Sequence, residues 1–197
     1  MAARRRYRSS LAPALATSFV ALMSCASPPG TPAIASPPSE PDERPAGARA
    51  FDFLYGAWEV SNRHLPDRLT GSEDWVEWPA TLLVVPILGG YGNIDRYVAH
   101  PNGTLLEGYS VRVYDPDDEV WSIEWVDTSG LRLTHQVTGT MGTQTGTFYG
   151  EEEYDGRVIP MRFVWSHDRV DRARWEQAYQ LDDGTWETNW VMEFTRR

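Results

Sequence analysis

The fold is decided by stretches such as residues 186–194, which have the sequence WETNWVMEF. Large apolar side chains stand at alternate positions in this stretch, and mostly polar side chains stand between them. A period of two is typical of a β-strand that buries one face. The same alternation recurs at residues 109–114, 121–125 and 161–167, and helical periodicity is nearly absent after residue 50. The pattern predicts an all-β chain.

Turn-forming sequences separate these stretches at regular intervals. They fall at residues 101–103, 115–117, 128–130, 140–142, 155–156, 168–169 and 182–184. Long strands joined by tight turns form an up-and-down meander, and closure protects the edge strands of such a sheet. We therefore expect an antiparallel up-and-down β-barrel, lipocalin-like, with about 8–10 strands.

The charge balance and the rarity of two residue types exclude several kinds of function. The 197 residues include 28 acidic and 18 basic side chains, which give a net charge of −10. This charge speaks against a nucleic-acid partner, because phosphate binding needs a basic face. The chain has no lysine, so Schiff-base chemistry on a protein amine is excluded. A single cysteine excludes an internal disulfide, and the four dispersed histidines predict no metal site.

The N-terminus has the pattern of an export signal. Four arginines lie within residues 4–8, and an apolar run follows at residues 11–23. The run ends in the sequence LMSC, which resembles a lipobox and makes Cys25 the predicted site of lipidation. Residues 1–24 would then be a lipoprotein signal peptide, and the mature protein would be lipid-anchored in a bacterial cell envelope, at the outer membrane or cell surface. The alternative is an ordinary secretory signal.

Residues 25–50 differ in composition from the rest of the chain. They contain seven of the fourteen prolines, mixed with alanine and serine. Such a segment buries little apolar surface and behaves as an extended, semi-stiff spacer. We expect a tether at residues 25–50 and one barrel domain at residues 51–197.

Residues 51–60, with the sequence FDFLYGAWEV, resemble the opening of lipocalin-like bacterial domains of unknown function. The resemblance continues through residues 86–93, 114–116, 121–125, 174–178 and 186–190. It implies a calycin-type barrel that is distantly similar to nitrobindin and fatty-acid-binding proteins, and it implies no settled activity. Nitrobindin-like members hold heme through a histidine on a late strand, for which His135 and His167 are candidates. We expect no cofactor, with heme as the alternative.

The alternating apolar faces should line the barrel interior with aromatic rings. Gln177, Thr188 and His167 have the same parity and should face inward with them. Aromatic walls with a few convergent polar groups are typical of a small-molecule pocket. The predicted ligand-binding residues are Trp58, Arg112, Trp125, Trp165, Trp175, Gln177, Asn189 and Trp190. Simple alternation would instead place Arg112 and Asn189 on the outer surface.

The sequence favours a protein that binds a small hydrophobic or aromatic molecule and touches the membrane only through its lipid, with the oligomeric state left open. The alternative is an acid/base enzyme of the cyclase, isomerase or dehydratase type. It needs a carboxylate such as Glu176 against the tryptophans of the interior, where burial would raise its pKa. Glu77, between Trp75 and Trp78, is a weaker candidate. A third possibility is an envelope accessory protein that only packs against partners. No catalytic motif is present, so a non-enzymatic role is favoured.

Overall fold

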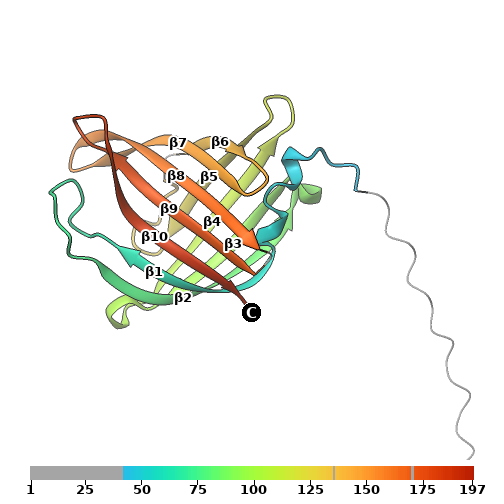
Figure 1. Cartoon of the computed structure of the whole chain (residues 1–197). Coiled ribbons are helices and arrows are strands. Elements are labelled where there is room, and N and C mark those ends of the chain that lie inside the picture. The colour runs from blue at the N-terminus through green and yellow to red at the C-terminus, as the bar shows by residue number, and fades with distance from the viewer. Residues whose placement is uncertain (1–41, 135, 170) are drawn as a thin grey trace, which may run out of the picture. The chain divides into compact units, whose positions relative to one another are not determined.

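The chain folds into a closed, antiparallel up-and-down β-barrel of ten strands, as the computed structural model shows for residues 42–134, 136–169 and 171–197 (Figure 1). The strands are β1 (Gly56–His64), β2 (Val76–Ile87), β3 (Gly92–Ala99), β4 (Leu106–Asp115), β5 (Val120–Asp127), β6 (Val137–Met141), β7 (Thr145–Tyr154), β8 (Arg157–Arg169), β9 (Arg172–Gln180) and β10 (Trp186–Arg196). Each strand pairs with its neighbours in sequence, and β1 closes the sheet by pairing with β10. The predicted fold class is confirmed.

The two ends of the barrel differ. The loops that follow β1, β3, β5, β7 and β9 lie at one end, which we call the mouth end. The chain enters β1 at the opposite end, where β10 also finishes (Figure 1). This second end, called the plugged end, is filled by the segment that precedes β1, residues 44–55, which we call the plug. It contains the short 3-10 helices η1 (Gly47–Arg49) and η2 (Asp52–Leu54).

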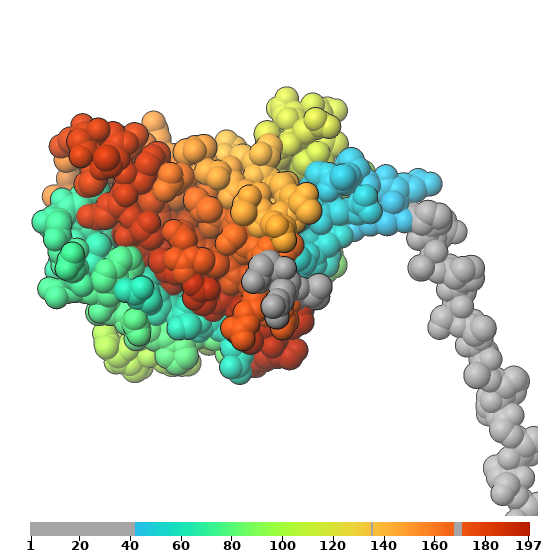
Figure 2. All heavy atoms as spheres, in the orientation of Figure 1, coloured from blue at the N-terminus to red at the C-terminus, as the bar shows by residue number. Residues whose placement is uncertain are grey.

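The segment before β1 is held in place by apolar packing and hydrogen bonds. Ala48, Phe51 and Leu54 are fully buried, and the Phe51 ring packs among other aromatic rings of the core. The Arg196 guanidinium donates to the carbonyls of Phe53 and Tyr55, at 2.6 and 2.7 Å. Figure 2 shows the segment in blue against this end of the barrel. Residues 44–50, which the sequence analysis assigns to the tether, therefore pack as part of the barrel unit.

The sequence alternation identifies the inward face of some strands and not of others. In β5 and β8 the large apolar residues do face the interior, as with Trp121 and Trp165. In β4 the parity is reversed: Ser110, Arg112 and Tyr114 are buried, and the apolar residues between them are only half-buried. The reason is that Arg112 finds its partners inside the barrel, on β3.

A β-bulge changes the parity of β10. The pairing with β9 shifts by one residue between Thr188 and Trp190, so Trp190 lies opposite Gln177 and Thr188 lies opposite Ala178. Such a bulge inserts one extra residue, here Asn189, and transfers later side chains to the other face. Thr188 therefore does not share the face of Gln177, and its predicted inward position is wrong.

No helix in the described part of the chain is both long and apolar enough to span a bilayer.

Candidate functional site

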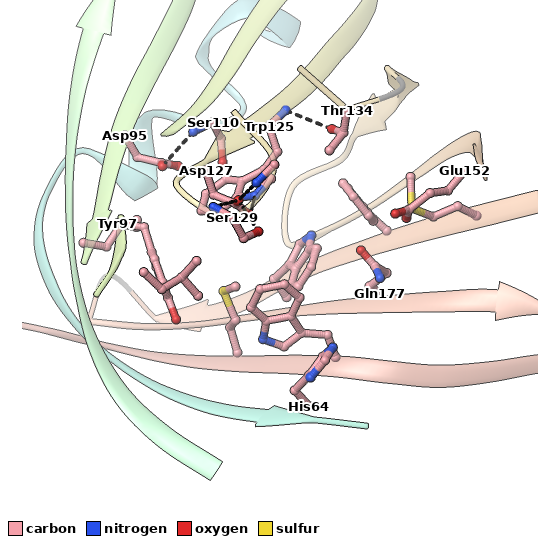
Figure 3. A pocket seen from close by; sticks show the side chains of 18 of the residues that line it. His64, Asp95, Tyr97, Ser110, Trp125, Asp127, Ser129, Thr134, Glu152 and Gln177 are labelled. Carbon is pink, nitrogen blue, oxygen red and sulfur yellow. Dashed lines mark hydrogen bonds between the residues drawn. The ribbon is translucent and has the colours of Figure 1, made fainter. Parts of the chain in front are cut away.

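A cavity of about 470 Å³ occupies the barrel interior and opens toward the mouth end. Its volume lies within the range of small-molecule pockets, roughly 300–1,000 Å³. Side chains from all around the barrel converge on it, and Figure 3 shows Tyr97, Trp125 and Gln177 directed into the same space. At the plugged end the rings around Phe51 pack inside the lumen, and a second cavity of about 370 Å³ lies beside the segment before β1, next to Phe53, Met141 and His167.

Aromatic rings form one wall of the cavity. The indole rings of Trp175 and Trp190 lie edge to face with centres 5.8 Å apart, and the Trp78 ring lies 6.0 Å from that of Trp190. Phe163 contacts Trp175 at 4.9 Å, also edge to face. Such offset geometries are the favourable ones for aromatic pairs. The wall therefore offers a preformed apolar surface to a flat molecule.

A buried asparagine fixes three of the lining side chains. Asn62 is fully buried on β1, and its Oδ1 accepts hydrogen bonds from the Tyr97 hydroxyl at 3.0 Å and from the Trp190 indole at 3.2 Å. The Tyr97 hydroxyl in turn accepts from the Trp78 indole at 2.8 Å. Burial raises the pKa of Tyr97 to about 12, so this hydroxyl stays protonated at neutral pH. Asn62 thus sets the rotamers of rings from three strands.

Arg112 is a buried polar group of the cavity. Its Nη1 donates to Asp95 Oδ2 at 2.7 Å and to Asn93 Oδ1 at 3.0 Å. The side chains of Arg112 and Asp95 are 4% and 1% exposed, so this is a buried ion pair. Asp95 Oδ1 also accepts from the backbone N–H of Ser110 (Figure 3). The Arg112 guanidinium lies 5.3 Å from the Trp165 ring centre and 5.8 Å from that of Phe51, which places it directly above the plug.

Hydrogen-bonded charges surround the mouth. Arg68 donates to the Tyr179 hydroxyl at 2.8 Å, and that hydroxyl donates to Glu152 at 2.5 Å. On the other side Asp127 accepts from the Trp125 indole at 2.8 Å. Burial raises the pKa of Asp127, but its hydrogen bonds, first of all that from the Ser129 hydroxyl, outweigh this effect and lower the pKa.

Six of the eight predicted ligand-binding residues line this cavity: Arg112, Trp125, Trp165, Trp175, Gln177 and Trp190. Trp58 does not line it. Its indole is buried at the plugged end, where it donates to the Leu54 carbonyl at 2.7 Å, because the segment before β1 fills that end of the lumen. Asn189 is buried in the wall behind the cavity, where its Oδ1 accepts from Gln177 Nε2 at 2.9 Å.

Several lining residues were missed by the sequence analysis. The most important are Asp95 and Tyr97 on β3, together with Ser110, His64 and Trp78. On β3 the inward positions 93, 95 and 97 hold polar or amphipathic side chains. Because these side chains are not apolar, apolar alternation does not identify the inward face of β3. The signal that could have identified it is the alternation of polar residues at 93 and 95, together with a possible partner, Arg112, on the next strand.

The carboxylates proposed for acid/base chemistry do not reach the cavity. Glu176 lies on the outer face of β9, where its Oε1 accepts from Arg174 at 2.6 Å. Glu77 is 66% exposed and pairs with Arg63 at 3.1 Å. Alternation explains both positions, because each residue is adjacent to an inward-facing neighbour. The acid/base hypothesis thus loses both of its candidates.

Of the candidates for heme and lipid attachment, only His167 is among the residues that the structure describes. His167 stacks on Phe53 with ring centres 3.9 Å apart, away from the large cavity. His135 and Cys25 lie outside the described residues. No cluster of three or more potential metal ligands occurs within the described ranges.

The comparisons with known proteins show the fold. No protein-family model matches the sequence, and no curated protein matches it. Among solved structures, Rv2717c from M. tuberculosis is similar over 78% of this chain and 98% of its own length, with a TM-score of 0.53 and 11% identity. A second structure, EF1p2_mFAP2b bound to DFHBI, covers 77% of this chain and 100% of its own length, with a TM-score of 0.43 and 15% identity.

Proposed function

We propose that this barrel binds a small, largely apolar or aromatic molecule in its interior. The observation that carries the proposal is the cavity of about 470 Å³ between the tryptophan wall and the plug. A barrel of ten strands is wide enough to leave such a space, and the packed rings around Phe51 occupy the other end of the lumen. Burial of apolar ligand surface against these rings supplies the binding free energy, at roughly 25 cal/mol per Å².

The pocket is built to be rigid before any ligand enters. The hydrogen bonds of Asn62 hold Tyr97 and Trp190, and the Asp127 carboxylate holds the indole of Trp125. Preorganised walls lower the entropic cost of binding. A protein that only packs against partners has no need of fixed aromatic rings around an internal space, so the geometry favours a binding role.

A pair of substitutions on β4 tests the proposal. Ser110 lines the cavity, whereas its neighbour Val111 lies on the opposite face of the same strand. Ser110→Phe places a ring in the cavity. It should abolish the binding of a panel of small aromatic molecules, measured by isothermal titration calorimetry. Val111→Phe adds the same ring outside and should leave binding intact. Absence of saturable binding to the native chain, or equal binding by both variants, would refute the proposal.

We propose further that a lipid on Cys25 tethers the barrel to a bacterial envelope membrane. The support is the sequence pattern alone: a basic start, an apolar run and a cysteine where that run ends. Mass spectrometry of the membrane fraction should find diacylglyceryl on Cys25. The Cys25→Ser variant should lose both the modification and membrane association. An unmodified, secreted native protein would contradict the tether and leave the binding proposal untouched.

A further inference from the structure

The buried polar atoms without partners in the deep part of the barrel are all hydrogen-bond donors. Among the described residues, Arg112 Nε, Asn93 Nδ2 and Trp165 Nε1 are buried and have no hydrogen-bond acceptor. Asn93 Oδ1 already accepts from Arg112, which fixes the orientation of this amide and leaves its N–H groups unpaired. Buried N–H groups nearly always have an acceptor. Within the described residues no protein group accepts from these three donors, which points to water or a bound molecule as the acceptor.

These donors form one cluster. Asn93 and Arg112 are direct cross-strand partners on β3 and β4, and the Arg112 guanidinium lies over the Trp165 ring. Both hydrogen bonds of Arg112 come from Nη1, and Nη2 has no partner within the described part of the chain. The edge formed by Nε and Nη2 is therefore unused, and this edge of a guanidinium presents two parallel N–H groups.

The charges around the cavity are already balanced. Three arginines and three carboxylates line it among the described residues, and Arg112 has its own counterion in Asp95 at 2.7 Å. A ligand carboxylate at the free edge would place a second negative charge next to a neutral, buried pair. Burial of an uncompensated charge is costly. An uncharged acceptor can use the same donors without this penalty.

We infer that the ligand carries an uncharged hydrogen-bond-accepting oxygen, of the carbonyl type, at the end that reaches Arg112. This inference rests on the proposed binding function and adds the chemical class of the molecule. Its apolar body lies against the tryptophan wall, and its carbonyl oxygen accepts from the Arg112 and Trp165 donors. In a cavity without ligand, water would be the acceptor for these donors, so a molecule that displaces this water needs an acceptor of its own.

Three probes with the same ring system test the inference by isothermal titration calorimetry on the full chain. They are 2-acetonaphthone (a neutral ketone), 2-isopropylnaphthalene (a hydrocarbon of similar shape) and 2-naphthoate (an anion). The double variant Arg112→Met/Asp95→Asn removes the ion pair without leaving a lone charge. We expect it to weaken ketone binding by about tenfold or more, because a hydrogen bond to a charged group contributes about 1.5–3 kcal/mol. Its affinity for the hydrocarbon should be unchanged.

A milder pair of variants covers the case in which the double variant does not fold. Trp165→Phe removes an unpartnered indole N–H and keeps an aromatic ring. It should therefore lower the affinity for the ketone more than the affinity for the hydrocarbon. Trp190→Phe is the matched control, because its N–H is already bonded to Asn62 and is not available to a ligand. Trp190→Phe should change the affinities for the ketone and the hydrocarbon by the same factor.

Each outcome decides a separate question. If the ketone loses no more affinity than the hydrocarbon in the Arg112 and Trp165 variants, the inference is overturned and the binding function stands. If naphthoate binds most tightly and depends on Arg112, the ligand is anionic and the inference is again overturned. If none of the probes binds the native chain, both the inference and the proposed function fail.

Discussion

The imidazole of His64 packs edge to face against the indole of Trp190, with ring centres 5.1 Å apart. On its other side it meets Trp78 at 5.8 Å, so a titratable ring sits between two tryptophans at the mouth end of the cavity. Burial, and to a smaller extent the nearby charge of Arg68, together lower the pKa of His64 from 6.5 to about 4. The neutral imidazole is therefore part of the folded structure at neutral pH.

This arrangement predicts a loss of stability at mildly acidic pH. The unfolded chain binds a proton at His64 near pH 6.5, whereas the folded protein does so only near pH 4. Between these values the unfolded state holds more protons, so stability falls as the pH falls through this window. Thermal unfolding of the native protein should show a decreasing Tm from pH 6.5 to pH 4. The His64→Phe variant, which keeps an aromatic ring, should show a flatter profile.

A second histidine provides the control for this pH experiment. His100 is exposed, so His100→Asn should retain the native slope. Asp127, whose pKa is lowered, contributes only at more acidic pH, because its stabilisation is lost below its ordinary value of 3.8. A His64→Phe profile as steep as the native one would show that another group causes the decline.

Gly108 is required beneath Trp125. A Cβ at position 108 would overlap the Trp125 ring, closer than van der Waals contact allows. Trp125 lines the cavity and is held by Asp127, so Gly108→Ala should displace the ring from the wall. We expect weaker binding of an aromatic probe and a changed near-UV circular dichroism signal. The control is Gly130→Ala, at a second glycine that lines the cavity, where an added Cβ meets only Arg132 Cγ at 3.8 Å and leaves the backbone N–H to Asp127 in place. A similar effect in both variants would argue against a specific role of Gly108.

The plug should contribute a large part of the stability of the barrel. The Phe51 ring is fully buried and meets Trp121 at 5.0 Å and Trp165 at 5.9 Å. Phe51→Ala leaves a cavity among these rings and should lower the free energy of unfolding by about 3–5 kcal/mol in urea titration. Val158→Ala, at a position that is 65% exposed, should change it by less than about 0.5 kcal/mol. If Phe51→Ala lowered the free energy of unfolding as little as Val158→Ala, the segment before β1 would not stabilise the barrel.

The strand pattern and the tryptophan wall could be predicted from the sequence because they depend on local alternation. Trp165, Trp175 and Gln177 lie on strands where large apolar residues face the interior, and the structure finds all three at the cavity. The period of two identifies such faces without any knowledge of the partner strands. The turn spacing likewise predicted about 8–10 strands, and the structure has ten.

The polar part of the site could not be predicted in the same way, because it depends on pairing between strands. Arg112 faces inward because its hydrogen-bond partners Asp95 and Asn93 face inward on β3. This pairing can be recognised only when the register between β3 and β4 is known. The position of Trp58 also depends on a contact that the local sequence does not show. Its parity is inward, but the folding back of residues 44–55 over that end of the barrel converts a lumen position into core.

Asn62 provides the sharpest test of how the cavity wall is held. Its carboxamide accepts from Tyr97 and Trp190, so Asn62→Ala leaves a buried hydroxyl and an indole N–H without this acceptor. We expect the free energy of unfolding to fall by about 2–6 kcal/mol, since each of the two unsatisfied groups costs about 1–3 kcal/mol. Ser61→Ala, the adjacent exposed position on β1, should be neutral. Ligand affinity should fall as well, because rings that must be ordered on binding cost entropy. A destabilised variant with unchanged affinity would show that Asn62 supports the fold without shaping the pocket.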